Sequence, residues 1–204
     1  VVDCSTSDPV STDRLGARLR ARGVAFVDAP LSRTPKDAWD GTLDVMVGGE
    51  DAEVARVEPV LRCFAGRIVR VGGPGTGHRM KLLNNFLSLG YGALYAEALA
   101  LSRKVGIAVE RFDAVVRDGR MDCGFYRTFM GHALEGNREA HRFTLANAYK
   151  DLRYLEGMAN ADGVPTGVAS AVKNSYAEAV AAGGGGPEDY VPHLADFVAR
   201  RSGA

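Results

Sequence analysis

The sequence has little cysteine, no excess of charge and no long apolar run, and each absence excludes a class of protein. Three widely separated cysteines, Cys4, Cys63 and Cys123, argue against a disulfide framework or a thiolate metal site. Twenty-five basic residues balance twenty-five acidic ones, so neither nucleic acid nor a membrane surface is expected as the main partner. No apolar run approaches the roughly 18 residues of a membrane span. We expect a cytoplasmic protein that binds a small neutral or anionic ligand.

Apolar residues make up 46% of the 204 residues, which is enough to form one large or two small hydrophobic cores. Short β-rich runs alternate with helical patterns over residues 1–74, which predicts an α/β domain. The expected elements are helices at 13–22 and 52–64 and strands at 24–28, 42–47 and 67–71. Val1–Asp3 resembles the end of a further strand, so we expect the first part of this sheet to precede residue 1.

Residues 75–204 show helical periodicity throughout, which predicts an all-α domain. The first expected helix would be about 45 Å long at 1.5 Å per residue, too long for one small domain to cover. It is expected to join the two domains or to pack against another subunit. The expected helices are 76–105, 109–118, 124–135, 144–162, 165–182 and 188–201.

One face of the first expected helix combines a cation with amides. Lys81, Asn84, Asn85 and Ser88 follow the spacing i, i+3, i+4, i+7 among leucines and other apolar residues. A lysine alone could extend along a core with its amine in water. Adjacent amides among leucines are costly unless they face a polar site, which favours a functional role. A lysine near a helix N-terminus suits general acid catalysis.

Other polar segments are more ambiguous. Gly72–Gly77 lacks the spacing of a dinucleotide loop, and we expect its glycines to let a substrate approach the backbone near a helix N-terminus. Ser32, Arg33 and Thr34 suit an oxyanion, or form a solvated turn. Ser5–Pro9 fits an ordinary helix N-cap. Lys150 and Asp151 would usually form a solvated pair, and the histidines show no metal-ligand spacing.

Several motifs together resemble the β-hydroxyacid dehydrogenases, the family of 3-hydroxyisobutyrate dehydrogenase and tartronate semialdehyde reductase. The family's order is preserved in Asp3-Cys-Ser-Thr6-Ser-Asp-Pro9, Asp28-Ala-Pro30, Gly41-Thr-Leu, Met46-Val-Gly-Gly49, Gly75-x-Gly77-x-x-x-Lys81-x-x-Asn84-Asn85 and Lys150-Asp-Leu152. The resemblance implies the C-terminal part of a Rossmann-type domain that binds NAD or NADP, a long interdomain helix and an all-α domain. A 6-phosphogluconate dehydrogenase is a nearby relative, but it needs more basic phosphate contacts.

The resemblance also implies roles for single residues. Lys81 is expected to be the general acid/base that protonates the alkoxide formed when hydride reaches an aldehyde. Asn85 and Asn84 are expected to orient the substrate, and Thr6 and Lys150 to contact the cofactor. Where the family has Ser-Gly-Gly, this chain has Ser32-Arg33-Thr34, which resembles the sulfolactaldehyde reductase branch. A sulfonate held by Arg33, Asn84 and Ser88 is therefore the expected variant of the substrate.

The glycine fingerprint GxGxxG does not occur where the family has it. If residues 1–204 were the whole polypeptide, we would expect no tight binding of NAD(P)H. The choice between NAD and NADP stays open, because the residue that distinguishes the two cofactors is expected in the first part of the Rossmann-type domain, before residue 1. A homodimer or homotetramer is expected. The alternatives are a non-catalytic helical dimerisation module or a truncated, inactive relative.

Overall fold

The computed structural model describes all residues 1–204, which form two compact units. One unit comprises residues 1–84 and 153–166, and the other comprises 85–152 and 167–204. Helix α4 (Thr76–Lys104), expected at 76–105, passes from the first unit into the second. The expected fold class, an α/β part followed by a helical part, is confirmed. The domain boundary between residues 74 and 75 stays a prediction.

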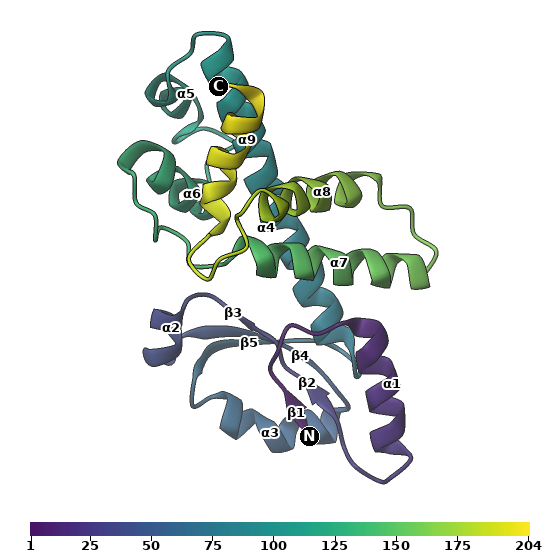
Figure 1. Cartoon of the computed structure of the whole chain (residues 1–204). Helices are drawn as coiled ribbons and strands as arrows, with labels where there is room; N and C mark the ends of the chain where they lie inside the picture. Colours follow the sequence, from purple (N-terminus) through teal and green to yellow (C-terminus); the bar gives the residue numbers. More distant parts are fainter. The chain divides into compact units, whose positions relative to one another are not determined.

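The first unit is built on a five-stranded sheet with β4 at its centre (Figure 1). Strand β5 pairs with β4 in parallel, while β2 and β3 pair with it antiparallel. Strand β1 adds to β2 in parallel. The strands are β1 (Val2–Asp3), β2 (Val27–Asp28), β3 (Leu31–Ser32), β4 (Leu43–Gly48) and β5 (Ala65–Gly72).

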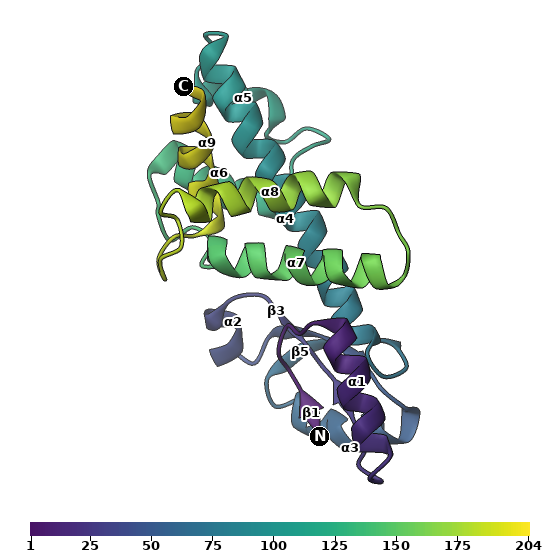
Figure 2. The same ribbon diagram turned by 45° about the vertical axis from the view of Figure 1, so that its right-hand side comes forward.

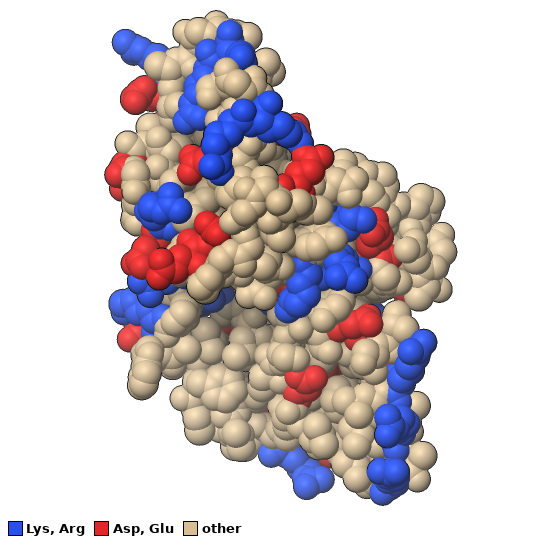
Figure 3. Space-filling view, in the orientation of Figure 1, with Lys and Arg blue, Asp and Glu red and all other residues tan.

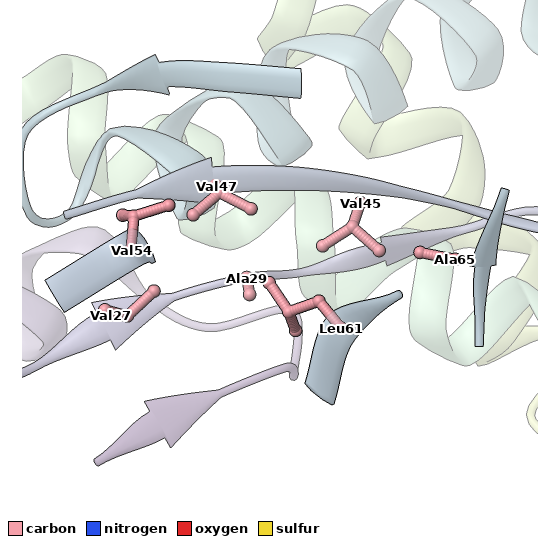
Figure 4. Packing of buried hydrophobic residues seen from close by; sticks show 7 residues of the cluster. All are labelled: Val27, Ala29, Val45, Val47, Val54, Leu61 and Ala65. Atoms are coloured by element: carbon pink, nitrogen blue, oxygen red, sulfur yellow. The ribbon is translucent and has the colours of Figure 1, made fainter. Parts of the chain in front are cut away.

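The core of this unit lies between the sheet and helix α3 (Asp51–Leu61). Val45 and Val47 alternate along β4 and are fully buried, as the period of a strand requires. Val54 and Leu61 are seven residues apart, so both lie on the face of α3 that meets the sheet. Figure 4 shows these side chains together with Val27, Ala29 and Ala65.

Helix α1 (Pro9–Arg20) begins four residues before the expected position, because its capping residue precedes the apolar pattern. The Asp8 side chain accepts a hydrogen bond from the Val10 amide (3.0 Å), and Pro9 occupies the first turn. The N-cap interpretation of Ser5–Pro9 is therefore confirmed. Figure 3 shows a row of basic side chains over α1, whose exposed arginines, continued into the following turn, are Arg14, Arg18, Arg20 and Arg22.

Two elements between β2 and β4 were not predicted. Strand β3 occupies the segment that we expected to be a turn, and helix α2 (Pro35–Trp39) follows it. A strand of two residues shows no alternation, so only its pairing with β4, eleven or more residues on, defines it. Helix α2 did have a local signal, since Thr34 and Asp37 form a capping box.

The second unit is entirely helical apart from an isolated bridge between Thr144 and Tyr190. Helices α6 and α9 lie beside α4 in both ribbon views (Figure 2). The hydroxyl of the buried Tyr176 donates to the Leu89 carbonyl of α4 (3.0 Å). A Cβ at Gly92 would lie 2.7 Å from that hydroxyl, so this contact requires glycine.

Over residues 75–204 the helix predictions agree with the structure within two residues, with one exception, whereas the helix expected at 52–64 ends three residues earlier, at Leu61. The helix expected at 188–201 is a short 3-10 helix, η1 (Val191–His193), followed by α9 (Leu194–Ser202). The others are α5 (Val109–Val116), α6 (Gly124–Glu135), α7 (Leu145–Ala161) and α8 (Gly167–Ala181). No helix combines the length and the apolar character that crossing a bilayer requires.

Candidate active site

The N-terminus of α4 is fixed by the carboxylate of Asp28, at the end of β2. The amides of Gly75 and His78 donate to its two oxygens at 2.6 and 2.7 Å, and Asp28 is fully buried. Helix N-terminal amides favour an anionic partner, which this aspartate supplies from within the protein. This contact sets the direction of the helix that carries Lys81.

Two glycines allow α4 to approach the sheet. A Cβ at Gly77 would lie 2.6 Å from the Met46 carbonyl, and one at Gly48 would lie 2.7 Å from Asp28. Separations below 3.0 Å are not compatible with a side chain at either position. We expected the glycines of 72–77 to let a substrate approach the backbone, and for Gly77 this was wrong: its open side faces β4 and Asp28.

Lys81 lies one turn into α4 and is half-buried. Its ammonium group donates to the Ser32 hydroxyl oxygen of β3 at 2.9 Å. Because that oxygen accepts from Lys81, the serine proton is directed to a different acceptor. The pair therefore places two groups that can donate hydrogen bonds, an ammonium and a hydroxyl, next to each other.

Arg33 and Thr34 follow Ser32 but make contacts of their own. The Arg33 Nε donates to Asp44 (2.9 Å), and this hydrogen bond raises the pKa of the half-exposed Arg33. Thr34 Oγ1 donates to Asp37 as part of the cap of α2. Arg33 also has a φ of 88°, in the left-handed region that glycine adopts without strain. Their roles in substrate binding stay predictions.

In the second unit, Asn85 faces a buried carboxylate. Its amide nitrogen donates to Asp151 Oδ2 at 2.8 Å, and Lys150 Nζ lies 3.1 Å from Asp151 Oδ1. The side chain of Asp151 is only 2% exposed, so the expectation of a solvated pair with Lys150 was wrong. An ionised carboxylate can only accept hydrogen bonds, so the NH₂ group of Asn85 and not its carbonyl oxygen must face Asp151. This fixes the orientation of the Asn85 side-chain amide.

We predict that Asp151→Ala lowers the free energy of unfolding of the second unit by about 2–3 kcal/mol. The substitution leaves the buried amide of Asn85 without its acceptor and removes the ion pair of Lys150. Urea denaturation followed by circular dichroism measures the change. Asp162→Ala, at an exposed aspartate after α7, is the matched control and should change stability by less than about 0.5 kcal/mol. Equal denaturation midpoints for both variants would contradict the prediction.

The remaining expected site residues are distributed over both units. Asn84 is exposed on the same helix face as Lys81, and the Ser88 hydroxyl donates to the Asn85 carbonyl (3.1 Å). Thr6 is half-buried in the loop between β1 and α1. Sequence reasoning did not assign Asp28 or Asp151 to the site. Only their positions in the motifs Asp28-Ala-Pro30 and Lys150-Asp-Leu152 pointed to them.

The residues present fit part of a dinucleotide site. At the end of β1 the Asp3 carboxylate accepts from the amide and hydroxyl of Ser5, which orders the loop that carries Thr6 before the N-terminus of α1. Hydroxyls and helix amides at the end of a strand suit a nucleotide cofactor. A GxGxxG loop is not present in residues 1–204. No group of three or more His, Cys, Asp or Glu side chains is arranged to hold a metal ion.

Comparison with known families accounts for nearly the whole chain. The family model for the NAD binding domain of 6-phosphogluconate dehydrogenase matches residues 1–73. The model for the NAD-binding part of NADP-dependent 3-hydroxyisobutyrate dehydrogenase matches residues 75–194. The chain belongs to the 3-hydroxyisobutyrate dehydrogenase family. The family membership expected from the sequence motifs is confirmed, and both matching models describe NAD-binding parts of dehydrogenases.

Individual members of the 3-hydroxyisobutyrate dehydrogenase family agree with this assignment. The 3-sulfolactaldehyde reductase of Escherichia coli (strain K12) is 33% identical over 185 residues, which cover 91% of this chain and 62% of the relative. An L-threonate dehydrogenase of Escherichia coli O6:H1 is 30% identical over 93% of the chain and 63% of its own length. This chain thus spans about three fifths of these relatives.

The fold agrees with a solved member of the 3-hydroxyisobutyrate dehydrogenase family. The structure of the Mycobacterium tuberculosis enzyme with L-serine is 27% identical and has a TM-score of 0.83. The match covers 94% of this chain and 68% of that protein.

Proposed function

We propose that this protein is an NAD(P)-dependent oxidoreductase that interconverts a small 3-hydroxyacid, or hydroxysulfonate, and its semialdehyde. The observation that carries the proposal is the hydrogen bond between Lys81 and Ser32, which brings an ammonium and a hydroxyl side by side. The names of the relatives support the reaction class. When bound, NAD(P)H supplies the hydride, and Thr6 and Lys150 would contact it.

In this proposal Lys81 moves the proton. During reduction its ammonium donates a proton to the oxygen of the aldehyde as negative charge develops there, and during oxidation the neutral amine takes the proton of the hydroxyl. Ser32 donates a hydrogen bond to the same oxygen or to the substrate's acidic group. Asn85 lies one helical turn after Lys81, so their Cβ atoms are about 5–6 Å apart. Asp151 holds the Asn85 amide in the orientation that leaves its carbonyl oxygen available to the substrate hydroxyl.

We further propose that the substrate ends in a strongly anionic group, such as a sulfonate. Asp44 accepts from Nε of the Arg33 guanidinium and Asp37 lies 3.9 Å from its Nη1, and the terminal nitrogens keep N–H donors for an anion. Asn84 and Ser88 would add polar contacts to the same group. The φ of 88° supports a functional role for Arg33, because a side chain at this backbone position is strained.

We predict that Arg33→Ala lowers kcat/KM for sulfolactaldehyde at least about tenfold, mainly through KM, because a hydrogen bond to a charged group contributes about 1.5–3 kcal/mol. Steady-state kinetics with sulfolactaldehyde, succinic semialdehyde and tartronate semialdehyde measure the effect. Arg33→Gly should show the same kinetic loss with higher stability, because glycine relieves the backbone strain. Arg56→Ala, an exposed and ion-paired arginine on α3, is the control. Equal efficiency of Arg33→Ala and wild type would reject the sulfonate.

A further inference from the structure

Two histidines of the helical unit lie side by side. His132 belongs to α6 and His193 ends η1, and their ring centroids are 4.7 Å apart. His193 is only 1% exposed. Arg138, which follows α6, and Asp196 of α9 are hydrogen-bonded to these rings. We call the four side chains the His193 cluster.

The hydrogen bonds of His193 determine which ring nitrogen carries its proton. Its Nδ1 lies 3.2 Å from the Tyr190 backbone amide and 3.3 Å from Arg138 Nη2, and both of these groups can only donate. Its Nε2 lies 2.8 Å from the Arg138 carbonyl, which can only accept. His193 is therefore a neutral imidazole with its proton on Nε2, and both of its nitrogens are already in use.

A second proton on His193 is incompatible with these contacts. It would bind to Nδ1, toward which the Tyr190 amide and the Arg138 guanidinium already point, so both hydrogen bonds would be lost. Protonation would also place two cations 3.3 Å apart, at Nδ1 and at Arg138 Nη2. Burial lowers the pKa of His193, and the charge of Arg138 acts in the same direction.

The other groups around His193 do not offset this cost. Asp196 would favour a charged ring, but its side chain is 45% exposed and already accepts a hydrogen bond from His132 Nε2 at 2.9 Å. The Nδ1 of His132 is buried without a hydrogen-bond partner. Tyr190 faces His193 with its aromatic ring, at 5.8 Å between the centroids. The cluster therefore stabilises the neutral form of His193.

The segment that His193 holds is paired with the start of α7. The Val191 amide donates to the Phe143 carbonyl, and the Leu145 amide donates to the Asp189 carbonyl, both at 2.8 Å. These hydrogen bonds form the isolated bridge of the helical unit. Leu145 is the first residue of α7, the helix that contributes the buried carboxylate of the candidate site. A change at His193 can thus reach the N-terminal end of that helix.

We propose that His193 is a proton-sensitive latch, which holds residues 189–193 against the start of α7 while it is neutral and releases them when Nδ1 is protonated. A histidine in an unfolded or opened segment has a pKa of about 6.5, and in the closed protein the pKa of His193 is lower. The latch therefore contributes its full stability above about pH 6.5 and loses it as the pH falls, by up to about tenfold per pH unit in the opening equilibrium. This inference does not depend on the catalytic role of Lys81.

Amide hydrogen exchange of the 204-residue chain tests the latch, when it is followed by NMR and corrected for the intrinsic exchange rate. We expect the opening equilibrium of the Val191 and Leu145 amides to rise about tenfold between about pH 7 and about pH 5. The Ile107 amide, which donates to the Ser102 carbonyl where α4 ends, is the control within the same unit. Its opening equilibrium should change by less than about twofold.

Two substitutions assign the pH dependence to His193. His193→Asn keeps a side-chain acceptor for the Tyr190 amide but cannot take up a proton, so its opening should not respond to pH in this range. Arg138→Met removes the cation beside Nδ1, so it should reduce the wild-type pH response by about half or more, and it tests the latch even if His193→Asn fails to fold. Long-range proton–nitrogen spectra of the rings should place the His193 proton on Nε2 at neutral pH. A proton on Nδ1, a wild-type opening that does not respond to pH, or an unchanged pH response in either variant would reject the latch.

Discussion

Replacing Lys81 by alanine is expected to reduce kcat about a thousandfold in a form of the protein that turns over with NAD(P)H. A positioned general acid typically contributes about 10²–10⁴ to the rate, and Lys81 is the cation that donates to Ser32. Substrate binding should change less than turnover, because Ser32 and the groups around the acidic end of the substrate remain. Steady-state kinetics in both directions, over a range of pH, measures the loss.

The control is Lys104→Ala, at the exposed end of the same helix, which should keep wild-type turnover. Lys81→Arg keeps the charge and the hydrogen bond to Ser32 but transfers a proton poorly, so it should bind substrate and remain slow. A variant Lys81→Ala that keeps more than about a tenth of the wild-type kcat would exclude general acid catalysis by this residue. If wild type shows no turnover in any form, the alternative of a non-catalytic dimerisation module gains support.

The long helix could be predicted from the sequence because its signals are local. Apolar periodicity continues from Met80 to Val105, and glycines precede its start, so the expected and observed ends differ by one residue. The stripe of Lys81, Asn84, Asn85 and Ser88 follows directly from that helix. Short elements had no such signal, which explains why β3 was not predicted and why the strand expected at 24–28 begins only at Val27, although its end at Asp28 was predicted correctly.

The partners of the site residues could not be predicted in the same way, because each contact joins distant parts of the chain. Ser32 lies 49 residues before Lys81, and Asp151 lies 66 residues after Asn85. Local composition made Asp151 resemble a solvated residue, and only the packing of α7 shows that it is buried. The same applies to Asp28, whose role depends on amides about 50 residues later.

Asp28→Ala is expected to lower the free energy of unfolding of the first unit by about 3–4 kcal/mol. The variant leaves the buried amides of Gly75 and His78 without an acceptor, and each unsatisfied group costs about 1–3 kcal/mol. Because these amides begin α4, the first turn of the helix should fray and Lys81 should lose its fixed distance to Ser32. Urea denaturation measures the stability, and amide hydrogen exchange of residues 73–80 measures the local opening.

Two comparisons separate this effect from ordinary capping. Asp8→Ala removes the cap of α1 at the surface of the same unit and should cost only about 1 kcal/mol. Asp28→Asn keeps one acceptor but turns an NH₂ group toward the second amide. Its free energy of unfolding should therefore fall by more than that of Asp8→Ala and by less than that of Asp28→Ala. If Asp28→Ala fails to fold, Asp28→Asn still tests the contact. The fold and the proposed site then depend on one carboxylate, since the group that anchors α4 to the sheet also aligns Lys81. Unchanged exchange at residues 73–80 in Asp28→Asn would contradict that link.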